Sequence, residues 1–278
     1  MRFSVAIAGH EQNEATRAFE DLAEAIVSAL RLLGHEVGSP RDPLPGRLIV
    51  LGAHLLPSGG AAARVPADAI VFNTEQVTSV GAPHLMRSRV VWDYSGTNIE
   101  ALGALGVPRL VHCPIGYVPS MTRIQPEERE PIDCLFYGAM NERRRQVLDE
   151  VAAAGVGLAA VRAYGAPRDR LIAQSKVVLN LHYYQSPIFE VVRCSHLFAN
   201  RRCVLTEAGG VDEELEELAG RAAVVSPRQD IAQACLALRA SEKERRAAAE
   251  RGFEEFRTID FVRSVERALD QTAAMERR

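Results

Sequence analysis

The sequence predicts an α/β protein made of two Rossmann-like domains that face a cleft. Short apolar runs alternate along the chain with segments of helical spacing, and most of these runs end at glycine or polar residues. The alternation stops at a segment rich in proline and charge and then starts again. Repeated β-α units of this kind form parallel sheets through right-handed crossovers, and 278 residues are enough for two domains.

The first half begins with an apolar run at residues 3–8 that is closed by Gly9, as is typical of a buried parallel strand. Residues 14–33 have helical spacing and stop at Gly34, a common residue after a helix. The many glycines and prolines of residues 39–66 predict loops around one strand. Further strands are predicted at residues 48–51, 69–72, 90–92 and 109–113.

The composition changes between the two halves. Residues 114–131 contain four prolines and many charges, without helical or strand periodicity. Such segments are typical of the connections between domains. We take residues 117–131 as the linker, which places the first domain at residues 1–116 and the second at residues 132–258.

The second half repeats the strand–helix plan. Strands are predicted at residues 132–137, 157–161, 176–181, 203–206 and 222–225. Helices are predicted at residues 142–154, 168–174, 188–199, 230–251 and 260–275.

Composition excludes several classes of protein. A net charge of −3 gives no strong attraction to nucleic acid or anionic membranes. The five cysteines are widely spaced and include no C-x-x-C pair, which favours a reducing cytoplasm over a disulfide framework or a zinc site. The N-terminus fits a first strand better than a signal peptide, and no apolar stretch approaches the roughly 18–20 residues of a transmembrane helix.

Ligands of open parallel sheets bind beyond the carboxyl ends of the strands. In the first half, Glu75, Asp93 and His10 follow predicted strands, and a carboxylate or a histidine can serve as a general base. We therefore take these three residues as candidate catalytic groups. Glu75 and Asp93 also fit helix capping, and His10 also fits a hydrogen bond within a loop.

In the second half, Ser186 is a predicted cap for a helix with Pro187 in its first position. The free N–H groups of such a helix start hold phosphates well. Glu190 lies one turn in, where its carboxylate either accepts hydrogen bonds from ribose hydroxyls or merely complements the helix dipole. His182, Tyr183 and Tyr184 precede this segment, either to stack on a ligand or to pack in the core.

The segment after the strand at residues 132–137 is the second part of this candidate site. Gly138 permits a tight turn, and Asn141 is a predicted N-cap. Arg143 and Arg144 stand in the first turn of the helix, where cations oppose the dipole, so an anion is expected nearby. A pyrophosphate fits because guanidinium groups pair with phosphate in bidentate fashion. The other interpretation is two exposed surface arginines.

Over residues 133–210 the chain resembles the C-terminal domain of GT-B glycosyltransferases, and most of all the family 1-like group with the spore-maturation (CgeB-type) enzymes. The resemblance rests on a strand that leads to a Phe-Glu helix and then to a strand ending in Thr-Glu. It implies that Glu190 binds the donor ribose and that Arg143 and Arg144 contact the diphosphate. Ile188 and Phe189, which precede Glu190, complete the implied donor site. His182 stands where many retaining members carry the first glutamate of an E-x7-E pattern.

The resemblance also implies a trimmed first domain and a C-terminal helix, residues 259–278, that packs back on it. The predicted function is transfer of a sugar, of the hexosyltransferase class, from a UDP- or GDP-type nucleotide sugar to an acceptor that the sequence does not identify. No cofactor is expected, and no metal either, because the sequence has no D-x-D-like motif. Two other functions stay open: a catalytically inactive nucleotide- or partner-binding module, and another enzyme on a doubly wound fold. Oligomeric state is open as well.

Overall fold

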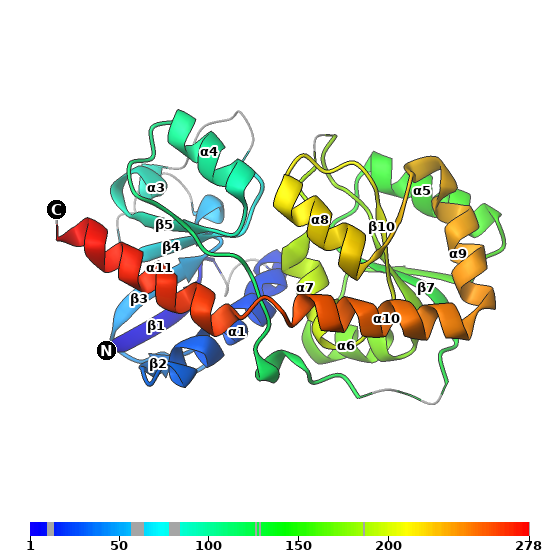
Figure 1. The fold of residues 1–278 in the computed structure, drawn as a ribbon, viewed down its shortest axis with the longest axis horizontal. Helices are drawn as coiled ribbons and strands as arrows, with labels where there is room; N and C mark the ends of the chain where they lie inside the picture. The colour runs from blue at the N-terminus through cyan, green and yellow to red at the C-terminus, as the bar shows by residue number, and fades with distance from the viewer. Residues whose placement is uncertain are drawn as a thin grey trace. The chain divides into compact units, whose positions relative to one another are not determined.

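A computed structural model describes residues 1–9, 14–56, 64–77, 84–125, 127, 129–185 and 187–277. The chain forms two compact units, one of Met1–Ser120 with Ile259–Arg278 and one of Met121–Thr258. Each unit holds a parallel sheet with helices between the strands, which confirms the predicted α/β class (Figure 1). Within the described residues, no helix has both the length and the apolar character needed to cross a membrane.

The first unit contains a six-stranded sheet in the order β2-β1-β3-β4-β5-β6. All its neighbouring strands are parallel. The strands are β1 (Arg2–Ile7), β2 (Glu36–Gly38), β3 (Arg47–Leu51), β4 (Ile70–Asn73), β5 (Val90–Asp93) and β6 (Leu110–His112). The helices are η1 (Glu14–Phe19), α1 (Glu20–Leu32), η2 (Ala53–Leu55), α3 (His84–Ser88), α4 (Gly96–Ala104), η3 (Pro119–Met121) and α11 (Phe261–Glu276).

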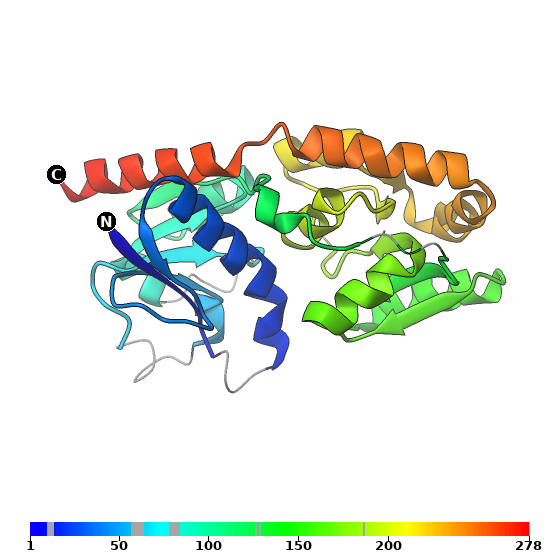
Figure 2. The same cartoon turned by 90° about the horizontal axis from the view of Figure 1, so that it is seen from below.

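The C-terminal helix α11 belongs to the first unit, although it follows the second unit in sequence. It packs against α1 and β6 (Figures 1 and 2). The indole Nε1 of Trp92 donates a hydrogen bond of 2.9 Å to Thr272 Oγ1, and both side chains are fully buried. At the start of the helix, a Cβ on Gly116 would lie only 2.2 Å from the carbonyl oxygen of Ile259, so only glycine fits there.

The second unit contains a five-stranded parallel sheet in the order β11-β10-β9-β7-β8. Helices α5 and α9 cover one face with the main apolar core, while α6 and α7 pack against β7, β9 and β10. The strands are β7 (Ile132–Tyr137), β8 (Leu158–Val161), β9 (Ser175–Asn180), β10 (Val204–Glu207) and β11 (Val224–Ser226). The helices are α5 (Glu142–Ala153), α6 (Gly165–Ala173), α7 (Val191–Ala199), α8 (Glu213–Ala222), η4 (Arg228–Asp230), α9 (Ile231–Ala240) and α10 (Glu242–Phe256).

Two predicted helices differ from the structure. The helix predicted at residues 230–251 is two helices, because Ser241 Oγ accepts a hydrogen bond of 3.2 Å from the N–H of Glu244 and starts α10. The helix predicted at residues 188–199 begins only at Val191. Residues 187–189 are all buried, and three consecutive residues of a helix would point to different sides, so a non-helical turn buries them instead. Helices α3, α4 and α8 and strand β2 were not predicted.

Candidate functional site

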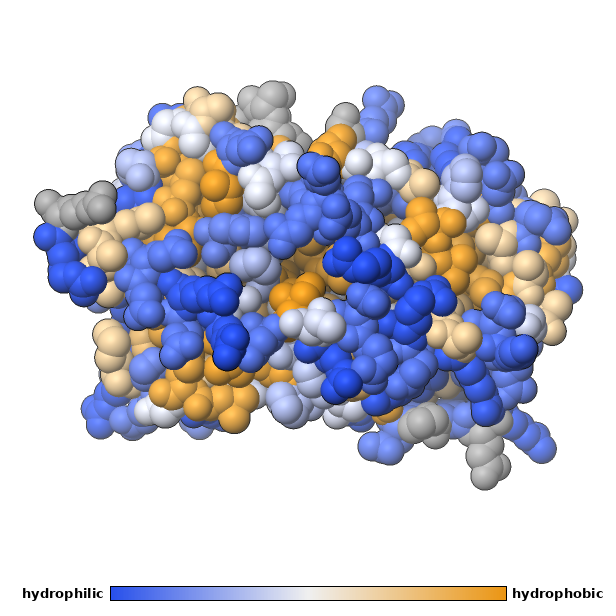
Figure 3. Space-filling model, in the orientation of Figure 1, coloured by the Kyte–Doolittle hydropathy of each residue, from blue (hydrophilic) through white to orange (hydrophobic). Residues whose placement is uncertain are grey.

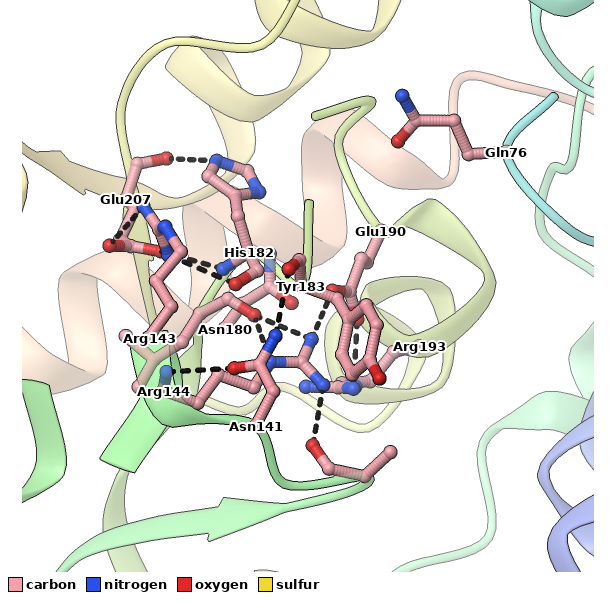
Figure 4. Close-up of polar contacts among 12 residues, drawn as sticks. Gln76, Asn141, Arg143, Arg144, Asn180, His182, Tyr183, Glu190, Arg193 and Glu207 are labelled. Carbon is pink, nitrogen blue, oxygen red and sulfur yellow. Dashed lines mark hydrogen bonds and ion pairs between the residues drawn. The ribbon is translucent and has the colours of Figure 1, made fainter. Parts of the chain in front are cut away.

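Polar side chains gather at the carboxyl ends of β7, β9 and β10 in the second unit (Figure 4). They come from three segments: the turn after β7 with the start of α5, the turn after β9 up to the start of α7, and the last residue of β10. These strands are neighbours in the sheet, so their ends bring the three segments together. The carboxyl edge of a parallel sheet is the usual place for a ligand.

The turn after β7 follows the sequence-based expectation. Gly138 has a φ of +140°, and a Cβ there would lie 2.7 Å from Nη2 of Arg193. Only glycine therefore combines this backbone with that close approach. Asn141 caps α5, with its Oδ1 accepting a hydrogen bond of 2.9 Å from the N–H of Arg144, and its Nδ2 donates to the carbonyl of Tyr183.

Arg144 is held inside the protein rather than exposed. Only 2% of the residue is accessible. Its guanidinium donates to the carbonyl oxygens of Leu181 and Ala139 and forms an ion pair with Glu190. The rings of Phe136 and Tyr183 lie 5.3 and 5.1 Å from the guanidinium carbon. Arg144 thus positions Glu190 and the turn after β9, and it does not present a free guanidinium to a ligand.

Glu190 is the N-cap residue of α7, with no capping hydrogen bond from its side chain. The prediction of a helix start beside Ser186 is therefore wrong, and Ser186 itself lies outside the described residues. The carboxylate is held by Arg144 on one oxygen and by Arg193 Nη2, at 2.8 Å, on the other. About a quarter of the side chain, 24%, stays accessible. A carboxylate has roughly four acceptor positions, so Glu190 keeps capacity for further hydrogen bonds.

Arg143 forms a bidentate pair with Glu207, the last residue of β10. Its Nη1 and Nη2 lie 2.7 and 2.9 Å from the two carboxylate oxygens, and Nη1 also donates to the carbonyl of His182. The Glu207 side chain is fully buried and also accepts the N–H of His182 at 2.6 Å. The anion that the sequence predicts beside Arg143 and Arg144 is therefore present within the protein, as the carboxylates of Glu207 and Glu190.

Three buried polar atoms of this cluster have no hydrogen-bond partner within the part of the chain that the structure describes: His182 Nδ1, Arg193 Nη1 and Asn180 Oδ1. The Nε2 of His182 contacts the carbonyl oxygen of Glu207 at 3.0 Å, so Nε2 carries the hydrogen and Nδ1 is an acceptor. Burial lowers the pKa of His182 more than the carboxylates of Glu207 and Glu190 raise it, so the ring is neutral near pH 7. Unpartnered buried polar atoms are rare and indicate a place for a ligand or water.

The remaining predicted donor-site residues lie beside this cluster and differ in exposure. Phe189 is fully buried and stacks on Phe198 with ring centroids 6.3 Å apart, so it is part of the core. Ile188 is 5% accessible. Tyr184 is partly exposed and meets the exposed ring of Tyr183 edge to face at 5.1 Å.

The first unit has its own polar groups at the carboxyl ends of β3, β4 and β5. Asp93 is completely buried and accepts hydrogen bonds from Asn73 Nδ2, the N–H of Ser95 and Asn98 Nδ2 at 2.6, 2.9 and 3.1 Å. This arrangement favours a structural role in fixing the turns, as opposed to a base that contacts a substrate. His10 lies outside the described residues.

Glu75 is the more accessible candidate, with 42% of its side chain exposed. Its carboxylate lies 3.8 Å from Nε2 of His54, which the sequence analysis did not single out. Burial lowers the pKa of His54, and its Nδ1 has no hydrogen-bond partner among the residues described. The structure thus adds a neutral histidine beside Glu75.

Sequence reasoning also missed Asn180, Arg193 and Glu207. A signal existed for two of them. Arg193 stands three residues after Glu190, a spacing that brings side chains together at a helix start. Glu207 is the glutamate of the Thr-Glu strand end that the family resemblance already includes. Asn180 had no distinguishing pattern within its apolar strand.

Comparison with solved structures identifies the architecture. The glycosyltransferase WaaG, which is involved in lipopolysaccharide biosynthesis, superposes with a TM-score of 0.58 at 12% identity, covering 97% of this chain and 98% of that chain. The glycosyltransferase AviGT4, involved in avilamycin A biosynthesis, gives a TM-score of 0.58 at 15% identity, covering 99% and 98%. The fold is that of GT-B glycosyltransferases. At these identities the likeness establishes the fold alone.

Sequence comparison gives less information about this protein than comparison with solved structures. No family model matches the chain. Uncharacterised protein L140 of Acanthamoeba polyphaga mimivirus is 26% identical over 158 residues, which are 53% of this chain and 51% of L140. The chain therefore matches about half the length of that relative. The spore-maturation subgroup stays a prediction. Among the described residues, no group of three or more histidine, cysteine or acidic side chains is arranged to hold a metal ion.

Proposed function

We propose that the protein is a glycosyltransferase that takes a sugar from a nucleotide-sugar donor, and that the second unit holds the donor at the carboxyl ends of β7, β9 and β10. The observation that carries the proposal is the set of buried, unpartnered atoms of His182, Arg193 and Asn180 around the accessible carboxylate of Glu190. The GT-B fold supports it. The proposed donor is a sugar nucleotide of the UDP or GDP type. The proposed location of the protein is the cytoplasm.

Glu190 is the proposed ribose ligand. Two guanidinium groups fix its carboxylate, so it meets a pair of hydroxyls without losing further side-chain freedom. The fixed orientation matters because a ribose offers two adjacent hydroxyl donors, which a carboxylate accepts in bidentate fashion. Arg144, which was predicted to contact the diphosphate, acts in this proposal by positioning Glu190.

Arg193 takes the role of the diphosphate ligand in place of Arg144. Its Nη1 is a buried N–H donor without a partner in the described part of the chain. Its guanidinium carbon lies 5.6 and 5.5 Å from the ring centroids of Phe136 and Tyr137, which hold it at the turn after β7. When the bond between the sugar and the diphosphate breaks, negative charge grows on the leaving oxygen, and a fixed cation stabilises it. Arg143 adds a second positive charge close by, shared with Glu207.

His182 is the proposed ligand of a sugar hydroxyl. Its neutral ring offers Nδ1 as a buried acceptor, and a hydroxyl is a matching donor. The same position holds a glutamate, also an acceptor, in the E-x7-E pattern. A histidine here thus keeps the accepting function and omits the negative charge.

The acceptor side is proposed to lie in the first unit. In the transfer, the acceptor hydroxyl attacks the anomeric carbon and its proton passes to a base. Of the predicted bases that the structure describes, Glu75 is the one with an accessible carboxylate, and His54 lies beside it. We assign the role of the base to Glu75. Transfer without a metal ion is part of the proposal, because arginines supply the positive charge.

A second function is favoured by one observation. The two arginines predicted to contact a diphosphate are already paired with Glu207 and Glu190. Arginines that are already paired with carboxylates of the protein have less charge to offer a leaving diphosphate, which fits a nucleotide- or partner-binding module without turnover. The histidine at position 182, where the E-x7-E pattern has its first glutamate, fits such a module as well.

Thermal unfolding with UDP, GDP, ADP and CMP tests the donor site. A nucleotide at 100 times its Kd adds about 2.7 kcal/mol of stability, so the matching nucleotide gives a clear rise in Tm. Glu190→Ala is expected to abolish the rise, whereas Glu217→Ala, at an exposed carboxylate on α8, keeps it. No rise with any of the four nucleotides, or an equal rise in Glu190→Ala, would contradict the proposal.

Turnover separates the two functions. Release of UDP or GDP from the matching nucleotide sugar, slow without an acceptor, is expected of a glycosyltransferase. The same release should fall strongly in Arg193→Gln, which removes the charge opposite the leaving group. Binding of the nucleotide without any release, over hours at high protein concentration, supports the binding module.

A further inference from the structure

A cavity lies in the second unit at the edge of the sheet opposite the candidate donor site. It opens at the amino ends of β7, β9 and β10, where Glu130, Ser175, Lys176 and Cys203 lie. Its other walls are the segment around residues 122–125 and the start of α10. The cavity volume is about 540 Å³, which is within the usual range of small-molecule pockets.

Cationic side chains outnumber carboxylates by six to three in the described lining of the cavity. Arg123, Lys176 and Arg201 each form an ion pair with a carboxylate beyond the lining, so the cations that matter most are those without a close partner. Hydrophilic side chains cover α10 on the face drawn in Figure 3. The cationic lining residues are Arg123, Lys176, Arg201, Arg202, Arg245 and Arg246.

Two of these guanidinium groups are almost buried and only loosely paired. Arg202 is 7% accessible and Arg245 is 8% accessible. Both share Glu130, whose carboxylate oxygens lie 3.7 Å from Arg202 Nη1 and 3.8 Å from Arg245 Nη2. Those separations are longer than hydrogen bonds. A cation removed from water needs a close partner, and within the described residues neither guanidinium has a carboxylate at hydrogen-bond distance.

The Nε of Arg202 strengthens that conclusion. It is a buried donor with no hydrogen-bond partner among the residues that the structure describes. Burial lowers the pKa of Arg202 against the opposing influence of Glu130 and Glu127, which is the expected response of a cation that lacks close neutralisation. By contrast, Arg245 directs its Nη1 to the carbonyls of Leu238 and Arg239 at 2.8 and 2.9 Å, which fixes its plane.

The wall opposite α10 is preformed. Asn200, at the end of α7, accepts the N–H groups of both Arg123 and Ile124 at 2.7 Å and donates to the carbonyl of Met121. Thr122 adds a hydrogen bond of 2.8 Å to the carbonyl of Ala199. These contacts hold the segment in place without a ligand, so little ordering is needed when one binds.

We propose that this cavity is a second anion site, which binds a small phosphate-bearing compound between Arg202 and Arg245. Guanidinium groups match phosphate oxygens in number and geometry, and the volume exceeds what a bare phosphate fills, so a phosphate ester fits best. Lys176 and Arg246 also line the cavity, each in an ion pair, Lys176 with Asp133 at 2.6 Å and Arg246 with Glu242. The site is independent of the proposed donor site, because the two lie at opposite edges of the sheet and share no residue.

Calorimetric titration of the whole protein with inorganic phosphate and with ribose 5-phosphate, in low chloride, tests the proposal. Saturable binding of at least one probe is expected. Arg202→Gln should weaken it by about tenfold, the loss of one charge-assisted hydrogen bond. Arg263→Gln, at an exposed arginine on α11, removes the same charge and should change nothing. Tighter binding of ribose 5-phosphate identifies an ester as the ligand, and equal binding identifies free phosphate.

Two further variants keep the test decisive. If Arg202→Gln does not fold, Arg246→Glu, at a position 81% exposed, reverses charge at the rim and should weaken binding as well. Arg193→Gln removes a cation at the proposed donor site and should leave phosphate affinity unchanged. Absence of saturable binding by both probes, unchanged affinity in Arg202→Gln and Arg246→Glu, or a loss confined to Arg193→Gln would each overturn the proposal.

Discussion

The two edges of the sheet in the second unit differ in how closely their arginines pair with carboxylates. At the carboxyl edge, Arg143 and Glu207 meet at 2.7 and 2.9 Å in a bidentate pair. At the amino edge, Arg202 and Arg245 share Glu130 at 3.7 and 3.8 Å. The arginines of the first edge are neutralised by carboxylates at hydrogen-bond distance, whereas Arg202 and Arg245 of the second edge are loosely paired and line a cavity. Arginine content alone therefore does not distinguish a donor site from an anion pocket.

The sharpest test of this comparison removes one carboxylate at each edge. Glu207→Ala should lower the free energy of unfolding by about 3 kcal/mol, because it leaves Arg143 and the N–H of His182 without their buried acceptor. Glu130→Ala should cost less, about 1 kcal/mol, because its carboxylate is 31% accessible and lies 3.7 and 3.8 Å from the two guanidinium groups, beyond hydrogen-bond distance. Urea denaturation measures both, and equal losses would break the comparison.

Gly138→Ala tests the turn that the carboxyl edge depends on. The variant strains the backbone at a φ of +140° and sets a Cβ against Arg193 Nη2, so a loss of more than about 1 kcal/mol is expected. The nucleotide-dependent rise in Tm should disappear with it. Gly155→Ala is the matched control, because Gly155 also has positive φ, +80°, but nothing lies within 4 Å of its Cβ. A retained rise in Gly138→Ala would contradict the role of Arg193.

The pH dependence of stability sharpens the account of His182. The pKa of His182 is lowered in the folded protein, so the unfolded chain binds more protons below about pH 6.5. Stability from this group is therefore complete above that pH and is lost as the pH falls toward the folded pKa. His182→Asn should make the decline between about pH 7 and 5 shallower. Chemical denaturation across this range measures it, with His84→Asn, at an exposed histidine, as the control. An unchanged decline in His182→Asn would show that the ring does not titrate as inferred.

The smallest expected effect is at the rim of the amino edge. Arg246→Gln should change the free energy of unfolding by no more than about 0.5 kcal/mol, because Arg246 and its partner Glu242 are both exposed. Its effect should appear instead as weaker phosphate binding at low salt. A large loss of stability would mean that the rim charges serve the fold and not a ligand.

Features that depend on neighbouring residues could be predicted from the amino-acid sequence. The α/β class follows from alternating apolar runs, and the cap at Asn141 and the turn at Gly138 follow from what those residue types permit. The start of α10 could also have been predicted, because Ser241 and Glu244 form the sequence pattern of a capping box. The later start of α7 could not be predicted in this way. Residues 187–189 are buried in a non-helical turn before the helix, and their burial depends on residues of the core that are distant in sequence.

Which charged side chains pair with one another depends on how the strands are arranged in the folded protein. Arg143 follows β7 and Glu207 ends β10. Only β9 separates these two strands in the sheet, so the long arginine side chain can reach the glutamate. The partners are 64 positions apart in sequence, and no local spacing encodes the order of strands. At the other edge, Arg202 and Arg245 share Glu130 at distances longer than hydrogen bonds. Residue types set which interactions are possible, and the strand order set the distances that make one pair tight and the other loose.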